Sequence, residues 1–271
     1  MGIKNRRTQL TLFILISYAH LWLLYGIGKL YDIQFSYDLK QPGGLLVLLG
    51  VPASLIAALV VTLIADGSEG PRRLFKRSLE WRFSPIWYLA AVIIPFVVTA
   101  LSTIAAVVFT EAEVPERWFS PSFPIGFLIF FLVYDGIGEE IGWRGLALPQ
   151  LQERLGSLGG NIAIGIAWAL WHLPLFFMPG SSQYGSSLPL YVYLLTCWSI
   201  VIGFLVNKAR GSVLVAILFH ETANFIAFVI QYPHTYVEII WGMSALIAIV
   251  FLPKPLIKVQ FKAEMHNNLG P

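Results

Sequence analysis

The sequence predicts an all-α membrane protein, a bundle of about eight transmembrane helices with both termini in the cytoplasm. The first observation is composition: of 271 residues, 57% are apolar and only 12% are charged, whereas average soluble proteins carry about 25% charged residues. The second is that the apolar residues fall into stretches of about 20, the length that crosses a bilayer. The third is the uneven distribution of basic residues among the connections. Together they argue against a soluble enzyme, a disordered chain and a nucleic-acid-binding protein.

The apolar stretches account for most of the chain. They lie at 9–30, 43–65, 86–110, 122–146, 160–178, 188–206, 210–229 and 236–252. The first follows the basic residues KNRR and, at about 20 residues, is too long for a signal-peptide core, so we interpret it as a retained span. The connections are short and rich in turn residues, as in QPGG and MPGSSQYGSS. With no internal repeat and no separate polar region, residues 1–271 are expected to form a single transmembrane domain.

The basic residues predict the orientation, because cytoplasmic connections are richer in Lys and Arg. With the N-terminus inside, most of the 18 Lys and Arg residues are cytoplasmic. The inner set is Lys4, Arg6, Arg7, Arg72, Arg73, Lys76, Arg77, Arg82, Arg144, Arg154, Lys208, Arg210, Lys254, Lys258 and Lys262. The outer set is Lys29, Lys40 and Arg117. An even number of spans agrees with two cytoplasmic termini.

Ionisable residues inside a membrane are costly and usually functional, and here they gather in three stretches. The fourth stretch holds Asp135, Glu139, Glu140 and Arg144, the fifth holds His172, and the seventh holds His220, Glu221 and Asn224. Counting 1.5 Å per residue from the cytoplasmic ends puts Glu139 roughly 10 Å deep, His172 roughly 18 Å and His220 roughly 15 Å. We therefore expect one polar cluster between the cytoplasmic face and about mid-membrane.

Helix geometry separates the two consecutive glutamates of the fourth stretch. Because a turn holds about 3.6 residues, Glu139 and Glu140 point about 100° apart. Glu140 shares a face with Arg144, four residues later, so these side chains can form an ion pair. One carboxylate can then face a cavity while Arg144 holds the other. Asp135 shares a face with Glu139, and whether it supports the site is left open.

The other two polar stretches repeat the four-residue spacing. Trp168 and His172 share one face of the fifth stretch, and His220 and Asn224 share one face of the seventh. Glu221 points to a different face from His220 and is expected to cap or pair elsewhere. The remaining histidines lie in the first stretch, an outer connection and the tail, and are not site candidates: His20, His234 and His266.

These side chains suit amide hydrolysis. A carboxylate buried near an imidazole can hold and deprotonate water, and an imidazole with a carboxamide can stabilise the oxyanion of a tetrahedral intermediate. No Ser or Cys is an obvious nucleophile, and Cys197 is interpreted as a small buried side chain. The sequence lacks HExxH, but one Glu and two His, with Asn224 as a weak fourth ligand, are also donors for a divalent metal such as zinc. No cofactor is therefore assigned.

Three short motifs resemble those of the CPBP family of intramembrane proteases, which includes the type II CAAX prenyl endopeptidases. EEIGWR at 139–144 is similar to the family's EExxxR motif, WALWH at 168–172 to an aromatic residue followed four later by His, and HETAN at 220–224 to HxxxN. Their order, spacing and placement on separate stretches agree with the family. The first three stretches resemble it only in being apolar. Trp168 stands where the second motif commonly has Phe, a conservative departure.

The resemblance implies an integral membrane hydrolase with a protease core at about 122–229 and an active site facing the cytoplasmic side. Glu139 would be the general base, working with His172 to activate water. His220 and Asn224 would form the oxyanion hole. The supporting residues would be Glu140, Arg144 and Trp168. The family was first described as metalloproteases and a metal-free, glutamate-dependent mechanism is now favoured; the sequence leaves the metal requirement open.

The predicted partners are the lipid bilayer and a peptide or prenylated-protein substrate. Family members that act on prenylated proteins remove the three residues after a lipidated cysteine, whereas many relatives are linked to other membrane-proximal peptides. Two other classes stay open. An ion-coupled transporter also uses intramembrane Glu and His, but the chain shows no repeat of the kind transporters carry. A catalytically inactive scaffold is disfavoured by the completeness of the three motifs.

Overall fold

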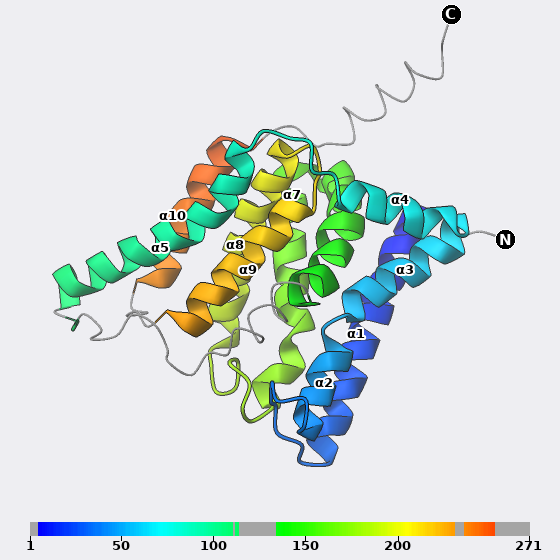
Figure 1. The fold of residues 1–271 in the computed structure, drawn as a ribbon, viewed down its shortest axis with the longest axis horizontal. Helices are drawn as coiled ribbons and strands as arrows, with labels where there is room; N and C mark the ends of the chain where they lie inside the picture. The colour runs from blue at the N-terminus through cyan, green and yellow to red at the C-terminus, as the bar shows by residue number, and fades with distance from the viewer. Residues whose placement is uncertain (1–4, 111, 114–133, 231–235, 253–271) are drawn as a thin grey trace, which may run out of the picture.

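The computed structural model describes residues 5–110, 112–113, 134–230 and 236–252, apart from the side chains of 228 and 229. These residues fold into helices (Figure 1). The helices of the first half are α1 (Arg6–Leu30), α2 (Pro42–Gly50), α3 (Ala53–Asp66), α4 (Glu69–Ser78) and α5 (Ile86–Thr110). Those of the second half are the helical residues 134–140, the π-helix η1 (Ile141–Ala147), α7 (Leu148–Trp171), the 3-10 helix η2 (Leu173–Phe177), α8 (Leu188–Lys208), α9 (Leu214–Val229) and α10 (Val237–Val250).

The prediction of a polytopic all-α membrane protein is confirmed. Within the described part of the chain, five helical segments are long and apolar enough to cross a membrane. They are Arg6–Leu30, Pro42–Asp66, Ile86–Thr110, Tyr134–Phe177 and Leu188–Lys208. Two shorter apolar helices, Leu214–Ala227 and Val237–Val250, occupy the seventh and eighth predicted stretches. The start of the predicted stretch 122–146 lies outside the described residues.

The segment Tyr134–Phe177 corrects two predicted boundaries. We expected one span to end at residue 146 and the next to start at 160, but the helix continues to Gly156, where φ is +74°. This left-handed conformation suits glycine, which has no Cβ. The chain folds back there, since a Cβ on Gly160 would lie only 2.8 Å from the backbone nitrogen of Gln152. The Cα of Gly160 therefore lies next to the preceding helix.

The C-terminal end of α7 also differs from the prediction. The expected span ran to residue 178, but α7 ends at Trp171 and His172 is its C-cap. Pro174 explains this end, because proline disfavours an α conformation in the residue before it and donates no backbone hydrogen bond. Residues 173–177 continue as the 3-10 helix η2. His172 therefore lies at the junction of α7 and η2, within the candidate span Tyr134–Phe177.

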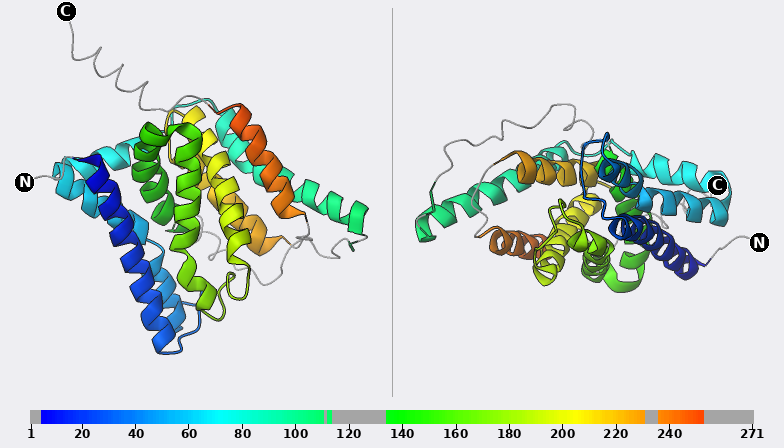
Figure 2. Two further views of the ribbon diagram at one scale, coloured as in Figure 1. Left: turned by 180° about the vertical axis from the view of Figure 1, so that it is seen from behind. Right: turned by 90° about the horizontal axis from the view of Figure 1, so that it is seen from below.

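The bundle has two flanks around a central hairpin (Figure 2). On one side α1 packs against α2 and α3, and on the other lie α5, α8, α9 and α10. The hairpin of residues 134–171 lies between them, and η1 contacts α3, α4 and α7. Gly142 permits this contact, because a Cβ there would lie 2.6 Å from the carbonyl oxygen of Ser54. All seven residues of η1 are buried, so the motif EEIGWR lies in the middle of the fold.

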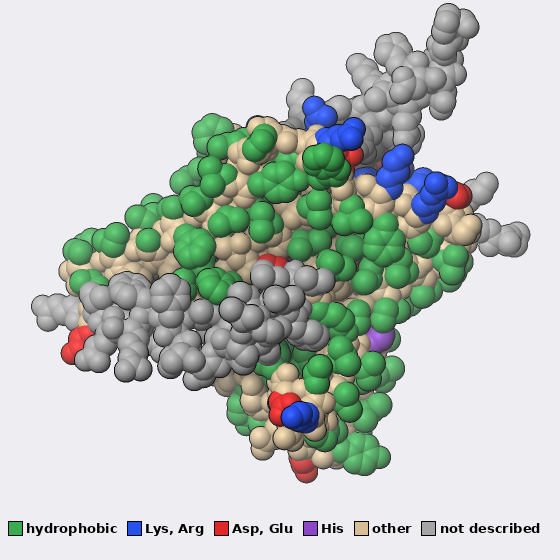
Figure 3. All heavy atoms as spheres, in the orientation of Figure 1, with side chains coloured by type: hydrophobic (Ala, Val, Ile, Leu, Met, Phe, Trp, Pro, Cys, Tyr) green, Lys and Arg blue, Asp and Glu red, His purple; other side chains and the backbone are tan. Residues whose placement is uncertain are grey.

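Lys and Arg side chains gather at one end of the bundle, over α4 and the neighbouring connections (Figure 3). Helix α4 carries four of them, Arg72, Arg73, Lys76 and Arg77. Arg77 donates from Nη2 to the carbonyl oxygen of Gly145, 3.0 Å away, which ties this basic helix to η1. We call this the basic end. The connections 31–41 and 178–187 lie at the opposite end (Figure 1).

Candidate active site

A cavity of about 370 Å³ lies beside the central hairpin. All four residues predicted as catalytic line it: Glu139, His172, His220 and Asn224. Trp168 and Asp135 line it as well. Its wall also includes Phe35, Tyr37 and Gln183, which come from the connections at the end opposite the basic end. The cavity therefore extends from the polar cluster toward that opposite end.

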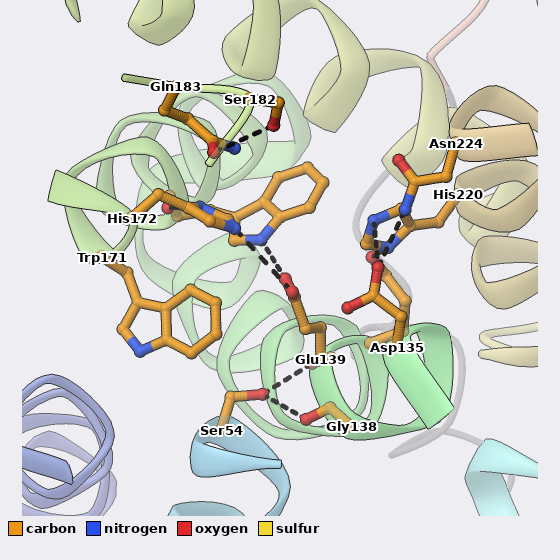
Figure 4. A network of polar contacts seen from close by, with 12 residues as sticks. Ser54, Asp135, Gly138, Glu139, Trp171, His172, Ser182, Gln183, His220 and Asn224 are labelled. Atoms are coloured by element: carbon orange, nitrogen blue, oxygen red, sulfur yellow. Dashed lines mark hydrogen bonds and ion pairs between the residues drawn. The ribbon is translucent and has the colours of Figure 1, made fainter. Parts of the chain in front are cut away.

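Contacts to neighbouring helices fix both the side chain and the backbone of Glu139. Glu139 is a buried residue with a relative exposure of 4%. Oε2 accepts a hydrogen bond of 2.5 Å from Trp168 Nε1, and Oε1 lies 3.8 Å from His172 Nε2. The Ser54 hydroxyl on α3 lies 2.9 and 2.8 Å from the carbonyl oxygens of Gly138 and Glu139 and can donate to either (Figure 4). The backbone and the carboxylate of Glu139 are thus both held from neighbouring helices.

The orientation of His172 follows from one hydrogen bond. Nδ1 lies 2.8 Å from the carbonyl oxygen of Trp168, and since a carbonyl oxygen only accepts, Nδ1 carries the hydrogen. Nε2 of a neutral ring is then an acceptor, and it faces Glu139. The ring of Trp171 contacts the imidazole edge-on with centroids 4.8 Å apart, and Tyr191 does so from another side at 5.7 Å.

Helix α9 supplies the facing wall through His220 and Asn224. Asn224 donates from Nδ2 to Asp135 Oδ2 at 2.8 Å. Nε2 of His220 lies 3.9 Å from the same oxygen, too far for a hydrogen bond. The ring of His220 meets the ring of Trp168 edge-on, with centroids 5.1 Å apart. Figure 4 shows these side chains on one side of the site and Glu139 with His172 on the other.

Glu140 and Arg144 lie behind the cavity. Their side chains are fully buried and form the ion pair expected from their spacing, with Arg144 Nη1 2.8 Å from Glu140 Oε1. The same carboxylate oxygen is 2.9 Å from His220 Nδ1. The guanidinium of Arg144 lies over the ring of Trp168, 4.3 Å from its centroid, which is cation–π distance. Glu140 thus links the hairpin to α9.

Sequence reasoning missed Ser54 and left Asp135 open. Ser54 is a serine in an apolar stretch, and nothing in its local pattern relates it to a motif about 85 residues later in the chain. Asp135 could have been found from its face, which it shares with Glu139, and its partner is Asn224. The carboxylate oxygens of Glu221 have no hydrogen-bond partner among the described side-chain contacts.

The donor set does not fit a metal ion. Within the described ranges, no group of three or more His, Cys, Asp and Glu side chains is arranged to hold one. Glu139 and His172 approach each other, but His220 points toward Asp135 and Glu140 instead. Oε2 of Glu139 is also engaged by the indole N–H of Trp168. We therefore derive no step through zinc.

These features define a polytopic helical membrane protein with a carboxylate–histidine cluster in a cavity among its helices. Residues 121–226 match the family model described as type II CAAX prenyl endopeptidase Rce1-like. The chain is also 26% identical over 241 residues to CAAX prenyl protease 2 of Methanococcus maripaludis, covering 82% of this chain and 85% of that protein. The two matches confirm the resemblance to the CPBP family and support a CAAX prenyl endopeptidase-like protease.

Proposed function

We propose that the protein is an intramembrane endopeptidase that hydrolyses a peptide bond with water activated by Glu139 and His172. One observation carries the proposal: Glu139 Oε1 and His172 Nε2 face each other at 3.8 Å in a cavity whose opposite wall holds His220 and Asn224. Two acceptors at this separation can both bind the hydrogens of one water molecule. A nucleophile and an oxyanion stabiliser on facing walls are what attack on a carbonyl requires.

The chemical steps balance with these groups alone. Glu139 removes a proton from the water held between it and His172, and the oxygen attacks the scissile carbonyl carbon. The carbonyl oxygen becomes an oxyanion and accepts hydrogen bonds from the side chains of His220 and Asn224. When the carbon–nitrogen bond breaks, Glu139 returns the proton to the leaving amine. The products are a carboxylic acid and an amine, and the proton of the acid then passes to the amine to leave a carboxylate and an ammonium group.

The role of His220 depends on Glu140. A carboxylate only accepts, so the 2.9 Å contact requires that Nδ1 of His220 donate to Glu140. Nε2 can then donate to an oxyanion only when the ring carries both protons. Glu140 suits this form because it places a negative charge next to the ring, and Arg144 holds Glu140 in place. Glu140 and Arg144 are therefore proposed as supporting residues.

The proposed substrate is a membrane-proximal peptide, with the C-terminal tripeptide of a prenylated CAAX protein as one candidate. The cavity wall suits a segment with a large apolar group, because aromatic side chains contribute much of it. They include Tyr25, Phe35, Tyr37, Trp171, Tyr191 and Trp198. The relative from Methanococcus maripaludis carries the name CAAX prenyl protease 2, which favours this candidate.

The side from which substrate enters stays a prediction. The positive-inside rule assigns the basic end to the cytoplasm, and the sequence predicts a cytoplasmic active site. The contribution of Phe35 and Gln183 to the cavity wall favours entry from the opposite end. A Gln183→Cys variant in a Cys197→Ser background tests this with a membrane-impermeant maleimide. If the basic end is cytoplasmic, labelling is expected in intact cells, and this result would contradict the predicted cytoplasmic active site and favour a peptide presented on the other side. Labelling only in inverted vesicles would support cytoplasmic entry, and with it a prenylated cytoplasmic substrate.

The first experiment is cleavage by purified protein in detergent, with a prenylated CAAX peptide and the same peptide without the lipid. Wild type is compared with Glu139→Gln and with the matched control Glu153→Gln, whose carboxylate is exposed in an ion pair with Arg6. We expect wild type and Glu153→Gln to cleave and Glu139→Gln to be inactive. Full activity of Glu139→Gln would overturn the proposed mechanism.

A further inference from the structure

The proposed mechanism uses the carboxylate of Glu139, but those of Asp135 and Glu238 also line the cavity. Asp135 lies one helical turn before Glu139 and lines the same cavity. Its Oδ2 atom accepts the hydrogen bond from Asn224 and lies 3.9 Å from Nε2 of His220 (Figure 4). One oxygen of Asp135 therefore lies near both groups that are proposed to stabilise the oxyanion.

The contact with Asp135 determines which end of the Asn224 carboxamide enters the cavity. A carboxamide has a donor end and an acceptor end, whereas an ionised carboxylate only accepts. Pairing with Asp135 therefore selects the orientation in which the NH₂ group of Asn224 faces the cavity. The NH₂ group has two hydrogens, and the hydrogen bond to Asp135 uses one of them. The second remains for a substrate oxygen.

The position of Asp135 also suits His220. Glu140 lies 2.9 Å from Nδ1 and Asp135 lies 3.9 Å from Nε2, so a carboxylate faces each nitrogen. Two negative neighbours favour a ring that donates from both nitrogens. The longer distance to Asp135 is above hydrogen-bond range, so Nε2–H remains available to a third group. The substrate oxyanion is that group in the proposed mechanism.

We propose that Asp135 is a positioning residue of the oxyanion hole: it fixes the Asn224 carboxamide with its donors toward the substrate and favours the donating form of His220. This inference rests on the proposed function. It differs from the opposite arrangement, in which the Asp135 carboxylate occupies the oxyanion hole and competes with the substrate carbonyl. The two arrangements predict opposite effects of removing the carboxylate, because one loses stabilisation of the transition state and the other gains access for the substrate.

The test compares Asp135→Ala and Asp135→Asn with wild type in the peptide cleavage assay. In Asp135→Ala the Asn224 amide can rotate and present its oxygen to the oxyanion, so we expect kcat to fall about 10- to 100-fold, somewhat less than the loss of a whole oxyanion-hole donor. KM should stay within about twofold of wild type, because the contact acts in the transition state. Asp135→Asn keeps an acceptor oxygen of nearly the same shape and should recover part of kcat.

The controls separate this inference from the proposed function. Asp38→Ala removes an exposed carboxylate that caps a turn by accepting from the backbone of Lys40, and should leave kcat unchanged. If Asp135→Ala has wild-type or higher kcat, or raises only KM, the positioning role is wrong while the protease assignment stands. If wild type fails to cleave, or Glu139→Gln cleaves normally, the proposed function fails and this inference with it. Thermal unfolding of each variant identifies any loss of fold, in which case Asp135→Asn decides.

Discussion

Two carboxylate–histidine clusters lie back to back in this protein, and they differ in what surrounds them. The cavity cluster consists of Glu139, Trp168 and His172 and lines the cavity. The buried cluster consists of the fully enclosed Glu140–Arg144 pair together with His220, which contacts Glu140 through Nδ1 and also lines the cavity. Glu139 and Glu140 are consecutive residues but belong to different clusters, because their side chains point about 100° apart around the helix axis.

The two clusters differ in how their negative charge is compensated. Glu140 has a guanidinium at 2.8 Å and an imidazole nitrogen at 2.9 Å. Glu139 has one indole N–H, and the imidazole nitrogen 3.8 Å away carries no hydrogen in the neutral ring. A buried charge is tolerated when it is paired, so the Glu140 carboxylate is expected to stay ionised in its pairs with Arg144 and His220. The weaker compensation of Glu139 suits a carboxylate that accepts a proton, which is the role proposed for it.

The largest effect is expected at Glu139. Glu139→Gln keeps the shape and the acceptor for Trp168 but removes the proposed base. We expect kcat to fall by roughly 10³-fold or more, in the upper part of the roughly 10²- to 10⁴-fold range that one acid–base group contributes, because the same carboxylate also holds the water. Thermal unfolding should change little. Cleavage assays and melting curves on the same preparation measure both. If Glu139→Gln lost stability as well as activity, the claim that the cavity cluster serves activity and the buried cluster serves stability would be wrong.

The second effect is on folding and concerns Arg144. Removing one partner of a buried ion pair leaves an uncompensated charge, which costs about 3–5 kcal/mol. We therefore expect Arg144→Ala to be strongly destabilised in detergent. The matched control is Arg72→Ala, which breaks an exposed pair with Glu69 at 3.4 Å and should cost about 0–1 kcal/mol. Similar melting temperatures for the two variants would show that the buried pair does not hold the fold.

A smaller effect is expected at Trp168, which belongs to the cavity cluster but also touches Arg144. Trp168→Phe removes the Nε1 donor to Glu139 and keeps an aromatic ring near the guanidinium. A hydrogen bond to a charged group contributes about 1.5–3 kcal/mol, and the freed carboxylate becomes a stronger base, which offsets part of the loss. We expect kcat to fall about tenfold, with Trp87→Phe as the control, because Trp87 packs on Phe204 outside the cavity. An inactive Trp168→Phe would mean that the indole N–H is essential.

The separation of the two clusters could be predicted from the sequence, since it depends only on helix period. The four-residue spacing of Glu140 and Arg144 predicted their ion pair, which is present at 2.8 Å. The positions of the helix ends were predicted less accurately. The predicted spans ended at residue 146 and began at residue 160, but the chain turns at Gly156, where φ is positive. No strong turn sequence distinguishes Gly156 from those two positions. Contacts between distant segments, such as that of Asp135 with Asn224, depend on how the helices pack.

Ser54 on α3 contributes one of the contacts between the two halves of the molecule, and the smallest effect is expected there. Its hydroxyl lies close enough to the carbonyl oxygens of Gly138 and Glu139 to donate to either, just where the α-helical pattern changes into the π-helix η1. Such a change of pattern leaves carbonyl groups without their usual helical partner, and it often occurs at functional sites. The hydroxyl supplies a partner from α3.

Ser54→Ala removes this donor and should cost about 1 kcal/mol of stability. The control is Ser102→Ala, whose buried hydroxyl donates within its own helix to Val98 at 2.7 Å. If Ser54 only fills space, both variants will lose similar stability and keep full activity. If it positions the backbone of Glu139, Ser54→Ala alone will lower kcat by a few-fold at equal stability, because the general base shifts relative to His172. That result would make the apolar first half of the chain part of the active site's support.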